Sequence, residues 1–174
     1  MSESPEIPEA NDPFGKRVAI TIAILAVILT VVQNKGDNAR TEAILKTNEA
    51  SNQWGYYQAK SIKQNLLESE AHLLNLLQGA GDPTARKAAI DEAVQGAKRY
   101  NGEKQDIKKE AEKFQHEAEH NNKINDRCDH AALALQIGVV VCSVAILSRW
   151  QLFWFIGTGL GLLGAAVGVT AFLM

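Results

Sequence analysis

Three apolar stretches around a charge-rich middle region constrain the fold of this chain more than any other feature. They cover residues 14–33, 131–148 and 152–174, and from Val18 onward none of them contains a charged side chain. The hydrocarbon core of a bilayer is about 30 Å thick, so a helix needs about 20 mostly apolar residues to cross it. The sequence therefore predicts an all-α membrane protein with three transmembrane helices.

The first stretch has two interpretations, an uncleaved anchor and a cleaved secretion leader. A leader ends at a cleavage site between small residues. Here Gln33-Asn34-Lys35-Gly36 follows, and a helical pattern resumes directly afterwards. We therefore predict an uncleaved transmembrane helix at 14–33, preceded by a disordered acidic tail at 1–13.

The second and third stretches form a membrane hairpin. Arg149-Trp150-Gln151 separates them, which leaves room only for a tight turn between helices. Amphipathic rings prefer the headgroup layer of a membrane. Four such rings gather at this turn: Trp150, Phe153, Trp154 and Phe155. The turn is therefore expected to lie at a membrane surface.

Charged residues beside the spans predict the orientation. Three spans put the N-terminus and the 149–151 turn on one side, and residues 37–130 on the other. Short segments rich in Lys and Arg stay in the cytoplasm, whereas a region as long as 37–130 is translocated largely regardless of charge. Lys16, Arg17 and Arg149 therefore predict a cytoplasmic N-terminus and a middle region outside the cytoplasm.

The middle region contains two rows of residues that alternate by four and three positions, the heptad spacing of a coiled coil. The first row consists of Thr41, Leu45, Asn48, Asn52, Gly55, Ala59, Ile62, Leu66, Ser69, Leu73 and Leu76. The second row consists of Ile90, Ala93, Ala97, Tyr100, Lys104, Ile107, Ala111, Phe114, Ala118, Asn121, Asn125 and Cys128. We expect two helices, at 37–78 and 83–130, to pack against each other through these rows.

Residues 79–82 break the first pattern and predict the turn between the two helices. Asp82 suits the N-cap of the second helix, and Pro83 suits its first position. A short turn makes neighbouring helices antiparallel. The sequence therefore predicts a long antiparallel coiled-coil hairpin over residues 37–130, outside the bilayer.

Polar residues occupy the membrane-proximal part of both rows, including Asn48 and Asn52. A polar residue in a coiled-coil core lowers stability but fixes the register and the number of chains. This favours assembly of several hairpins into a homo-oligomer. The alternative is a solvated, partly frayed base of the hairpin.

Charge excludes one class of partner. Between Asp37 and His130 there are 14 basic and 16 acidic residues, closely interspersed. Such a surface has no extended positive field to attract a phosphate backbone. No nucleic-acid partner is expected.

His116 to His120 match the zinc-protease pattern H-E-x-x-H, in which two histidines bind zinc and the intervening Glu acts as the base. A catalytic zinc also needs a third protein ligand held by a surrounding fold. The later candidates, Asp129 and His130 among them, lie on the same helix and cannot easily turn back. We therefore predict a coincidental match, with an interfacial metal site as the weaker alternative, and expect no catalytic residue and no cofactor.

Trp54-Gly55-Tyr56-Tyr57 is unusual inside a helix, because Gly costs about 1 kcal/mol relative to Ala and large rings cover more than one face. We expect a close neighbour at this point. Trp54 and Tyr57 would then pack against the second helix or a neighbouring subunit. The alternative is a surface for another protein partner.

Glycines form one smooth face of the third span, at Gly157, Gly161, Gly164 and Gly168. Small residues let another helix approach closely. That helix is either the chain's own second span or a helix of another copy, and the sequence leaves both open. Gln136 is strongly polar deep in a span and is expected to face a partner or a cavity.

The segments 38–44 and 51–63, with Trp54-Gly55-Tyr56-Tyr57-Gln58-Ala59-Lys60 at their centre, resemble an uncharacterised bacterial family of small membrane proteins, domain-of-unknown-function family forty-three thirty-seven. The resemblance extends from the first span to the last. It implies a multi-pass protein of the bacterial inner membrane and brings no assigned activity or catalytic residue.

Together these features predict a membrane-anchored, self-assembling helical scaffold or interaction module without enzymatic activity. One alternative is an oligomeric channel or transport component with the third span near a pore, although the spans contain no ionisable residue. A zinc-dependent hydrolase is a minor alternative. The expected partners are the lipid bilayer, further copies of the chain and an unidentified protein.

Overall fold

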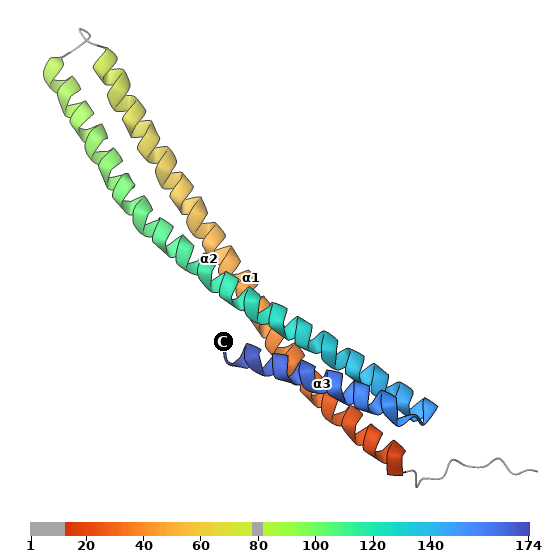
Figure 1. The fold of residues 1–174 in the computed structure, drawn as a ribbon. Coiled ribbons are helices and arrows are strands. Elements are labelled where there is room, and N and C mark those ends of the chain that lie inside the picture. The colour runs from red at the N-terminus through yellow and green to blue at the C-terminus, as the bar shows by residue number, and fades with distance from the viewer. Residues whose placement is uncertain (1–12, 78–81) are drawn as a thin grey trace, which may run out of the picture. The chain divides into compact units, whose positions relative to one another are not determined.

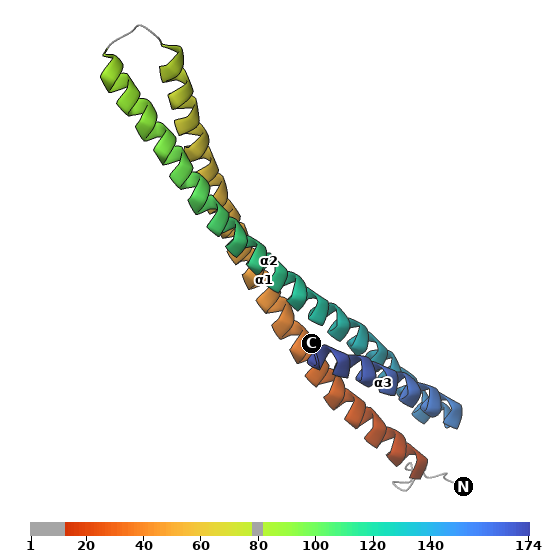
Figure 2. The ribbon, with the colours of Figure 1, turned by 60° about the vertical axis from the view of Figure 1, so that its left-hand side comes forward.

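The computed structural model describes residues 13–77 and 82–174, and it places nearly all of them in three α-helices. These are α1 (Pro13–Leu76), α2 (Pro83–Ser148) and α3 (Gln151–Phe172), seen from two sides in Figures 1 and 2. The described residues include no strand, which confirms the all-α prediction. Each helix contains a window long and apolar enough to cross a membrane.

Helices α1 and α2 each run without a break from an apolar window into the charged region. The predicted segments 14–33 and 37–78 therefore belong to one helix, as do 83–130 and 131–148. Gly36 does not interrupt α1, because a single Gly costs only about 1 kcal/mol and this one is buried against Cys128. Of the predicted tail and turn, residues 1–12 and 79–81 lie outside the described residues.

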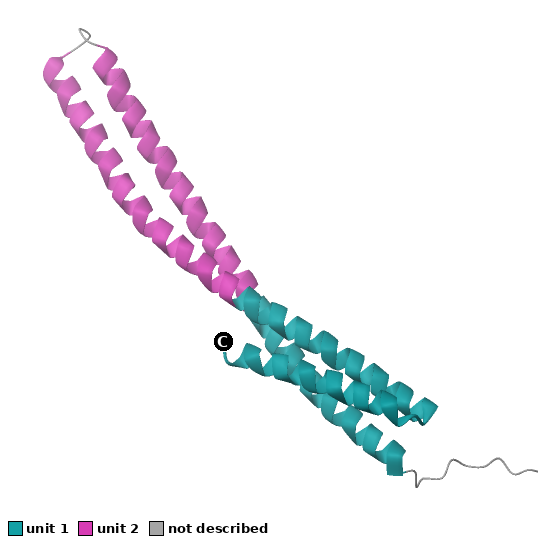
Figure 3. Cartoon of the chain, viewed as in Figure 1, with its two compact units in different colours: residues 1–41, 121–174 teal, residues 42–120 magenta. Residues whose placement is uncertain are grey.

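The chain divides into two compact units, which are described separately (Figure 3). Unit 1 contains residues 1–41 and 121–174, and unit 2 contains residues 42–120. Unit 1 therefore holds all of α3 and the apolar parts of α1 and α2.

In unit 1, α3 packs closely on both other helices through its glycine face. Gly157 and Gly164 lie against α2, whereas Gly161 and Gly168 lie against α1. A Cβ atom added to Gly161 would lie 2.5 Å from the side chain of Leu25. Since real Cβ contacts are never this short, only Gly permits this helix separation. Of the two alternatives left open by the sequence, the structure shows the intramolecular one.

The α2–α3 turn is held by aromatic contacts and by one unusual backbone conformation. Trp154 donates a hydrogen bond from Nε1 to Oγ1 of Thr21, at 3.2 Å, and its ring meets Phe14 edge to face. Arg149 has a φ of 52°, the left-handed region that a non-glycine residue adopts at a cost of about 1 kcal/mol. This conformation lets the chain reverse within two residues.

In unit 2, α1 and α2 lie side by side and run in opposite directions (Figure 3). Helix α2 begins as predicted, because the backbone N–H of Thr84 donates to the Asp82 carboxylate at 2.9 Å. Asp82 is therefore the N-cap, and Pro83 occupies the first helical position. Both predictions are confirmed.

The predicted contact row is right for α2. Its members are all buried or half-buried, and the fully buried ones within unit 2 are all alanines: Ala93, Ala97, Ala111 and Ala118. Small residues on this face allow α1 to approach closely.

The predicted contact row is wrong for α1, because every one of its eleven residues is exposed. The face that contacts α2 lies two positions earlier, which is about 200° around a helix. We call this face the inner row: Ala43, Lys46, Ala50, Gln53, Tyr57, Lys60, Gln64, Leu67, Ala71 and Leu74. The heptad spacing was therefore right and the face wrong. An alanine face on α2 fits alanines and long flexible side chains better than a row of leucines, which would hold the helices apart.

Candidate interaction surface

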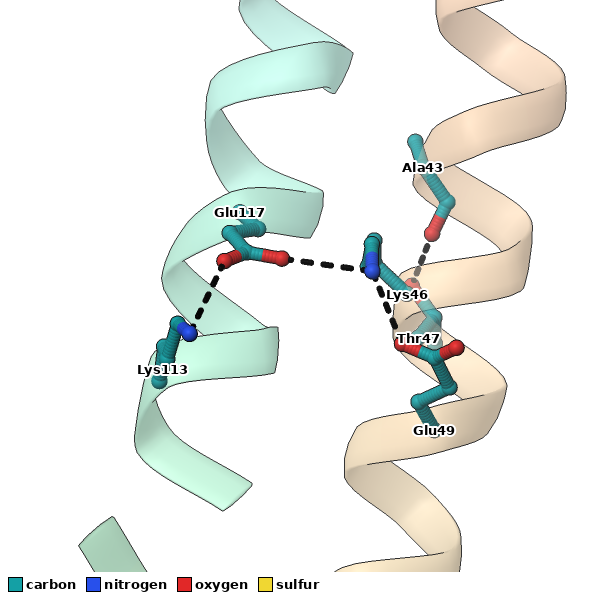
Figure 4. Close-up of polar contacts among 6 residues, drawn as sticks. All are labelled: Ala43, Lys46, Thr47, Glu49, Lys113 and Glu117. Carbon is teal, nitrogen blue, oxygen red and sulfur yellow. Dashed lines mark hydrogen bonds and ion pairs between the residues drawn. The ribbon is translucent and has the colours of Figure 1, made fainter. Parts of the chain in front are cut away.

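Long polar side chains, rather than leucines, connect the two helices of unit 2. The Nζ atom of Lys46 lies 3.0 Å from the Glu49 carboxylate and 3.4 Å from that of Glu117 across the gap (Figure 4). It also lies 5.1 Å above the ring of Phe114. One lysine of α1 thus holds both a carboxylate and an aromatic ring of α2.

The same arrangement recurs further from unit 1. Lys60 forms an ion pair with Glu103, and its Nζ lies 5.0 Å from the ring centroid of Tyr100. In both cases the aromatic residue precedes the glutamate by three positions, which is one helical turn. We call these two groups the lysine clasps.

The clasps show that the register of the hairpin is regular. From Lys46 to Lys60 the chain advances 14 residues along α1, and from Glu117 to Glu103 it retreats 14 residues along α2. Fourteen residues are two heptads, so an equal face returns on both helices. This internal repeat was missed in the sequence, although a lysine repeated at 14 residues, opposite a repeated aromatic-x-x-Glu, is visible there.

Charge pairing changes the titration of the clasp residues. The hydrogen bond from Lys60 lowers the pKa of Glu103 below its ordinary value of 4.5, and Lys60, Arg99 and Lys63 add favourable Coulomb interactions. In the other clasp, the Glu49 carboxylate, followed by that of Glu117, raises the pKa of Lys46 above 10.5. Both groups therefore stay charged at neutral pH, but they are solvent-accessible and their pairs are screened by salt.

The aromatic segment divides between the two faces of α1. Tyr57 lies on the inner row, with Nζ of Lys104 at 5.8 Å from its ring centroid, and Trp54 packs edge to face on Tyr57 at 5.6 Å. The predicted packing of these two rings against the second helix is therefore confirmed. Gly55 and Tyr56 point elsewhere: a Cβ at Gly55 would meet nothing within 4 Å, and Tyr56 is 62% exposed. The predicted close neighbour at Gly55 is wrong within a single chain.

The histidine motif lies on the surface of α2. His116 and His120 are both exposed, whereas Glu117 between them is held by Lys46 and by Lys113 at 3.9 Å (Figure 4). A general base must be free to accept a proton, and two lysines oppose that by stabilising the carboxylate. Among residues 13–77 and 82–174, no group of three metal-ligating side chains comes together. Glu117 thus has a structural contact that its place in the motif did not predict.

The exposed row of α1 is the most apolar surface of unit 2. We call its unit 2 members, from Leu45 to Leu76, the outer stripe. Five of them are large and apolar, with exposed fractions between 52% and 68%: Leu45, Ile62, Leu66, Leu73 and Leu76. Asn48 and Asn52 belong to the same stripe and are likewise exposed. A regular apolar stripe of this length in a charged helix marks a contact surface.

Gln136 and the glycine face of α3 occupy different surroundings in unit 1. Gln136 is exposed and lines a surface hollow with Gln33, Asp37 and Asp129. The glycine face is covered by the chain's own helices, with Gly161 beneath Leu25. The face on which the pore alternative depended is therefore already occupied.

Comparison with known proteins places the chain in a family. No curated protein and no solved structure matches it. One family model matches residues 14–174, which include all three helices and both units. The chain belongs to the family described as domain of unknown function DUF4337.

Proposed function

We propose that this protein is a membrane-anchored helical scaffold that assembles with copies of itself and has no enzymatic activity. Residues 42–120 form an antiparallel coiled-coil hairpin outside the bilayer, and the apolar windows of α1, α2 and α3 anchor it. The observation that carries the proposal is the outer stripe. Its five large apolar side chains are exposed on a helix otherwise rich in charge, and their burial against another copy would be favourable by about 25 cal/mol per Å².

The anchoring windows support the membrane part of the proposal. Each of the three helices contains an 18-residue window with a mean hydropathy of 1.9 or more. The side chains facing outward there are aliphatic, such as Ile20, Ile24 and Val27 on α1, and they would contact lipid chains. The charged residues of unit 2 would be costly in that environment.

The proposed topology places the N-terminus in the cytoplasm and residues 42–120 outside it, at a bacterial inner membrane. Lys16, Arg17 and Arg149 support this orientation. An Asn101→Cys variant tests it, because Asn101 is exposed on α2 of unit 2. A thiol reagent that cannot cross membranes should label this variant in intact cells. Labelling only after the cells are broken would reverse the orientation.

The assembly itself is tested by the mass of the detergent-extracted full chain, measured by light scattering. The wild type should have a multiple of the single-chain mass. Leu66→Glu combined with Leu73→Glu places charges on the outer stripe and should reduce that mass to one chain. The control, Asn75→Glu combined with Gln105→Glu, adds the same charge at exposed positions off the stripe and should leave the mass unchanged. A wild type that is monomeric at all concentrations would refute the proposed self-assembly.

A further inference from the structure

We infer that two copies pair through their outer stripes in parallel and in register, so that Asn52 of one chain meets Asn52 of the other. The inference rests on the proposed self-assembly and goes beyond it by naming the surface, the direction and the register. The partner is a second copy of this chain, and its α1 would pack against the side of α1 that faces away from α2.

The spacing of the outer stripe favours a helix as its occupant. The stripe alternates by three and four residues without interruption from Leu45 to Leu76, a length of roughly 45 Å at 1.5 Å per residue. A second helix that follows it over this distance must carry the same 3.5-residue repeat. The inner row and the α2 row have this repeat but are already paired with each other. The outer stripe of another copy has it as well and is free.

The residue types fit a parallel two-stranded pair. In heptad notation, Leu45, Asn52, Ala59, Leu66 and Leu73 take position a, and Asn48, Gly55, Ile62, Ser69 and Leu76 take position d. An asparagine at a specifies register and chain number, because the polar side chain avoids an apolar partner. Asn52 satisfies that requirement when it meets its own counterpart, which occurs only in parallel and in register.

The charges beside the stripe favour the same direction. The g positions contain no carboxylate, Lys or Arg: Ile44, Ser51, Gln58, Asn65 and His72. The e positions contain Glu49, Lys63 and Glu70. In a parallel pair each g residue faces an e residue of the other chain, so no like charges meet. In an antiparallel pair e faces e, and Glu49 would meet Glu70 twice, which is unfavourable.

Gly55 is explained by this pairing and by nothing within one chain. A glycine in the middle of a helix costs about 1 kcal/mol relative to alanine. Since a Cβ there would meet no atom within 4 Å, the chain's own packing does not require this glycine. On the outer stripe, Gly55 and the neighbouring Ala59 would let two α1 helices approach closely. The exposed ring of Tyr56 beside them would then cover the contact.

Disulfide cross-linking of the detergent-extracted full chain tests the inference. Ala59→Cys and Ser69→Cys place a thiol on the stripe, and Asn75→Cys places one on the same helix but off the stripe. The native Cys128 and Cys142 are buried, so the wild type measures the background. A disulfide needs Cβ atoms about 4 Å apart, so both stripe variants should give roughly tenfold more disulfide-linked dimer than Asn75→Cys.

A mixed experiment tests direction. Co-expressed Leu45→Cys and Leu73→Cys chains should form links only between like chains, since a parallel in-register pair brings each position next to itself. Links between Leu45→Cys and Leu73→Cys would mean an antiparallel pair and would overturn the inference.

The failure of the inference differs from the failure of the proposed self-assembly. A wild type with the mass of one chain would refute both. A wild type with the mass of several chains, but with no excess cross-linking at Ala59→Cys and Ser69→Cys over Asn75→Cys, would refute only the pairing through the outer stripe.

Discussion

At the scale of single residues, unit 2 is held together by lysines that each serve two partners. Lys46 and Lys60 reach across the gap to a glutamate and to an aromatic ring one turn away from it. Their aliphatic stems lie along the alanines of both helices while their charges remain near water. This arrangement gives a specific register without a large apolar core.

The first prediction concerns the Lys60–Glu103 pair and pH. The folded-state pKa of Glu103 is lowered, so its contribution to stability is present above about pH 4.5 and is lost as the pH falls through the lowered pKa. Glu103→Gln should therefore lower the melting temperature at pH 7 and have almost no effect near pH 3. Thermal unfolding followed by circular dichroism measures both differences. An equal loss at the two pH values would show that the charge of Glu103 is not the cause.

The second prediction concerns Gly102, an exposed glycine inside α2. A Cβ at this position would meet nothing within 4 Å, and the backbone is helical. Gly102→Ala should therefore stabilise the chain by up to about 1 kcal/mol, because alanine has the higher helix propensity. Gly138→Ala is the opposite case, since its Cβ would lie 2.8 Å from the carbonyl oxygen of Gly157, and it should destabilise. Chemical denaturation of both variants gives the comparison.

At the scale of helices, the sequence predicts the number, type and approximate limits of the elements, and it predicts heptad spacing on both long helices. It does not predict which face of α1 meets α2. The rule that large apolar residues face the partner selects Leu66 and Leu73, but those residues are exposed, and Ala43 and Ala50 are buried instead. Since α2 offers an alanine face, the choice depends on the fit between two surfaces. No single-helix pattern contains that information.

The third prediction concerns the packing of α3. Gly161→Leu places a large side chain where Leu25 already lies, and overpacking of this kind costs about 1–3 kcal/mol. The variant should unfold at a lower temperature whatever its oligomeric state. Gly159→Leu on the same helix is the matched control, because a Cβ there meets nothing within 4 Å. A variant Gly161→Leu as stable as Gly159→Leu would mean that α3 does not pack on α1 in the membrane.

At the scale of the whole molecule, two surfaces with the same repeat lie on one helix. The inner row of α1 belongs to the chain's own hairpin, and the outer stripe is assigned here to a second copy. Two adjacent leucines separate the two roles: Leu67 is half-buried on the inner row against Gly96, and Leu66 is 68% exposed. A sequence that carries two interfaces on one helix shows one heptad pattern for each, and the more apolar pattern need not be the intramolecular one.

The last prediction uses this pair of leucines. Leu67→Ala removes a contact within each chain, so it should lower stability by about 1–2 kcal/mol at every protein concentration. Leu66→Ala removes a contact between chains and should lower the melting temperature only where the wild type is assembled, because stability from association depends on concentration. Melting curves of the wild type and both variants over a hundredfold dilution series in detergent would separate these effects. If Leu66→Ala lowered the melting temperature equally at all dilutions, Leu66 would belong to the core of the single chain. If it had no effect even at the highest concentration, the outer stripe would be uncovered.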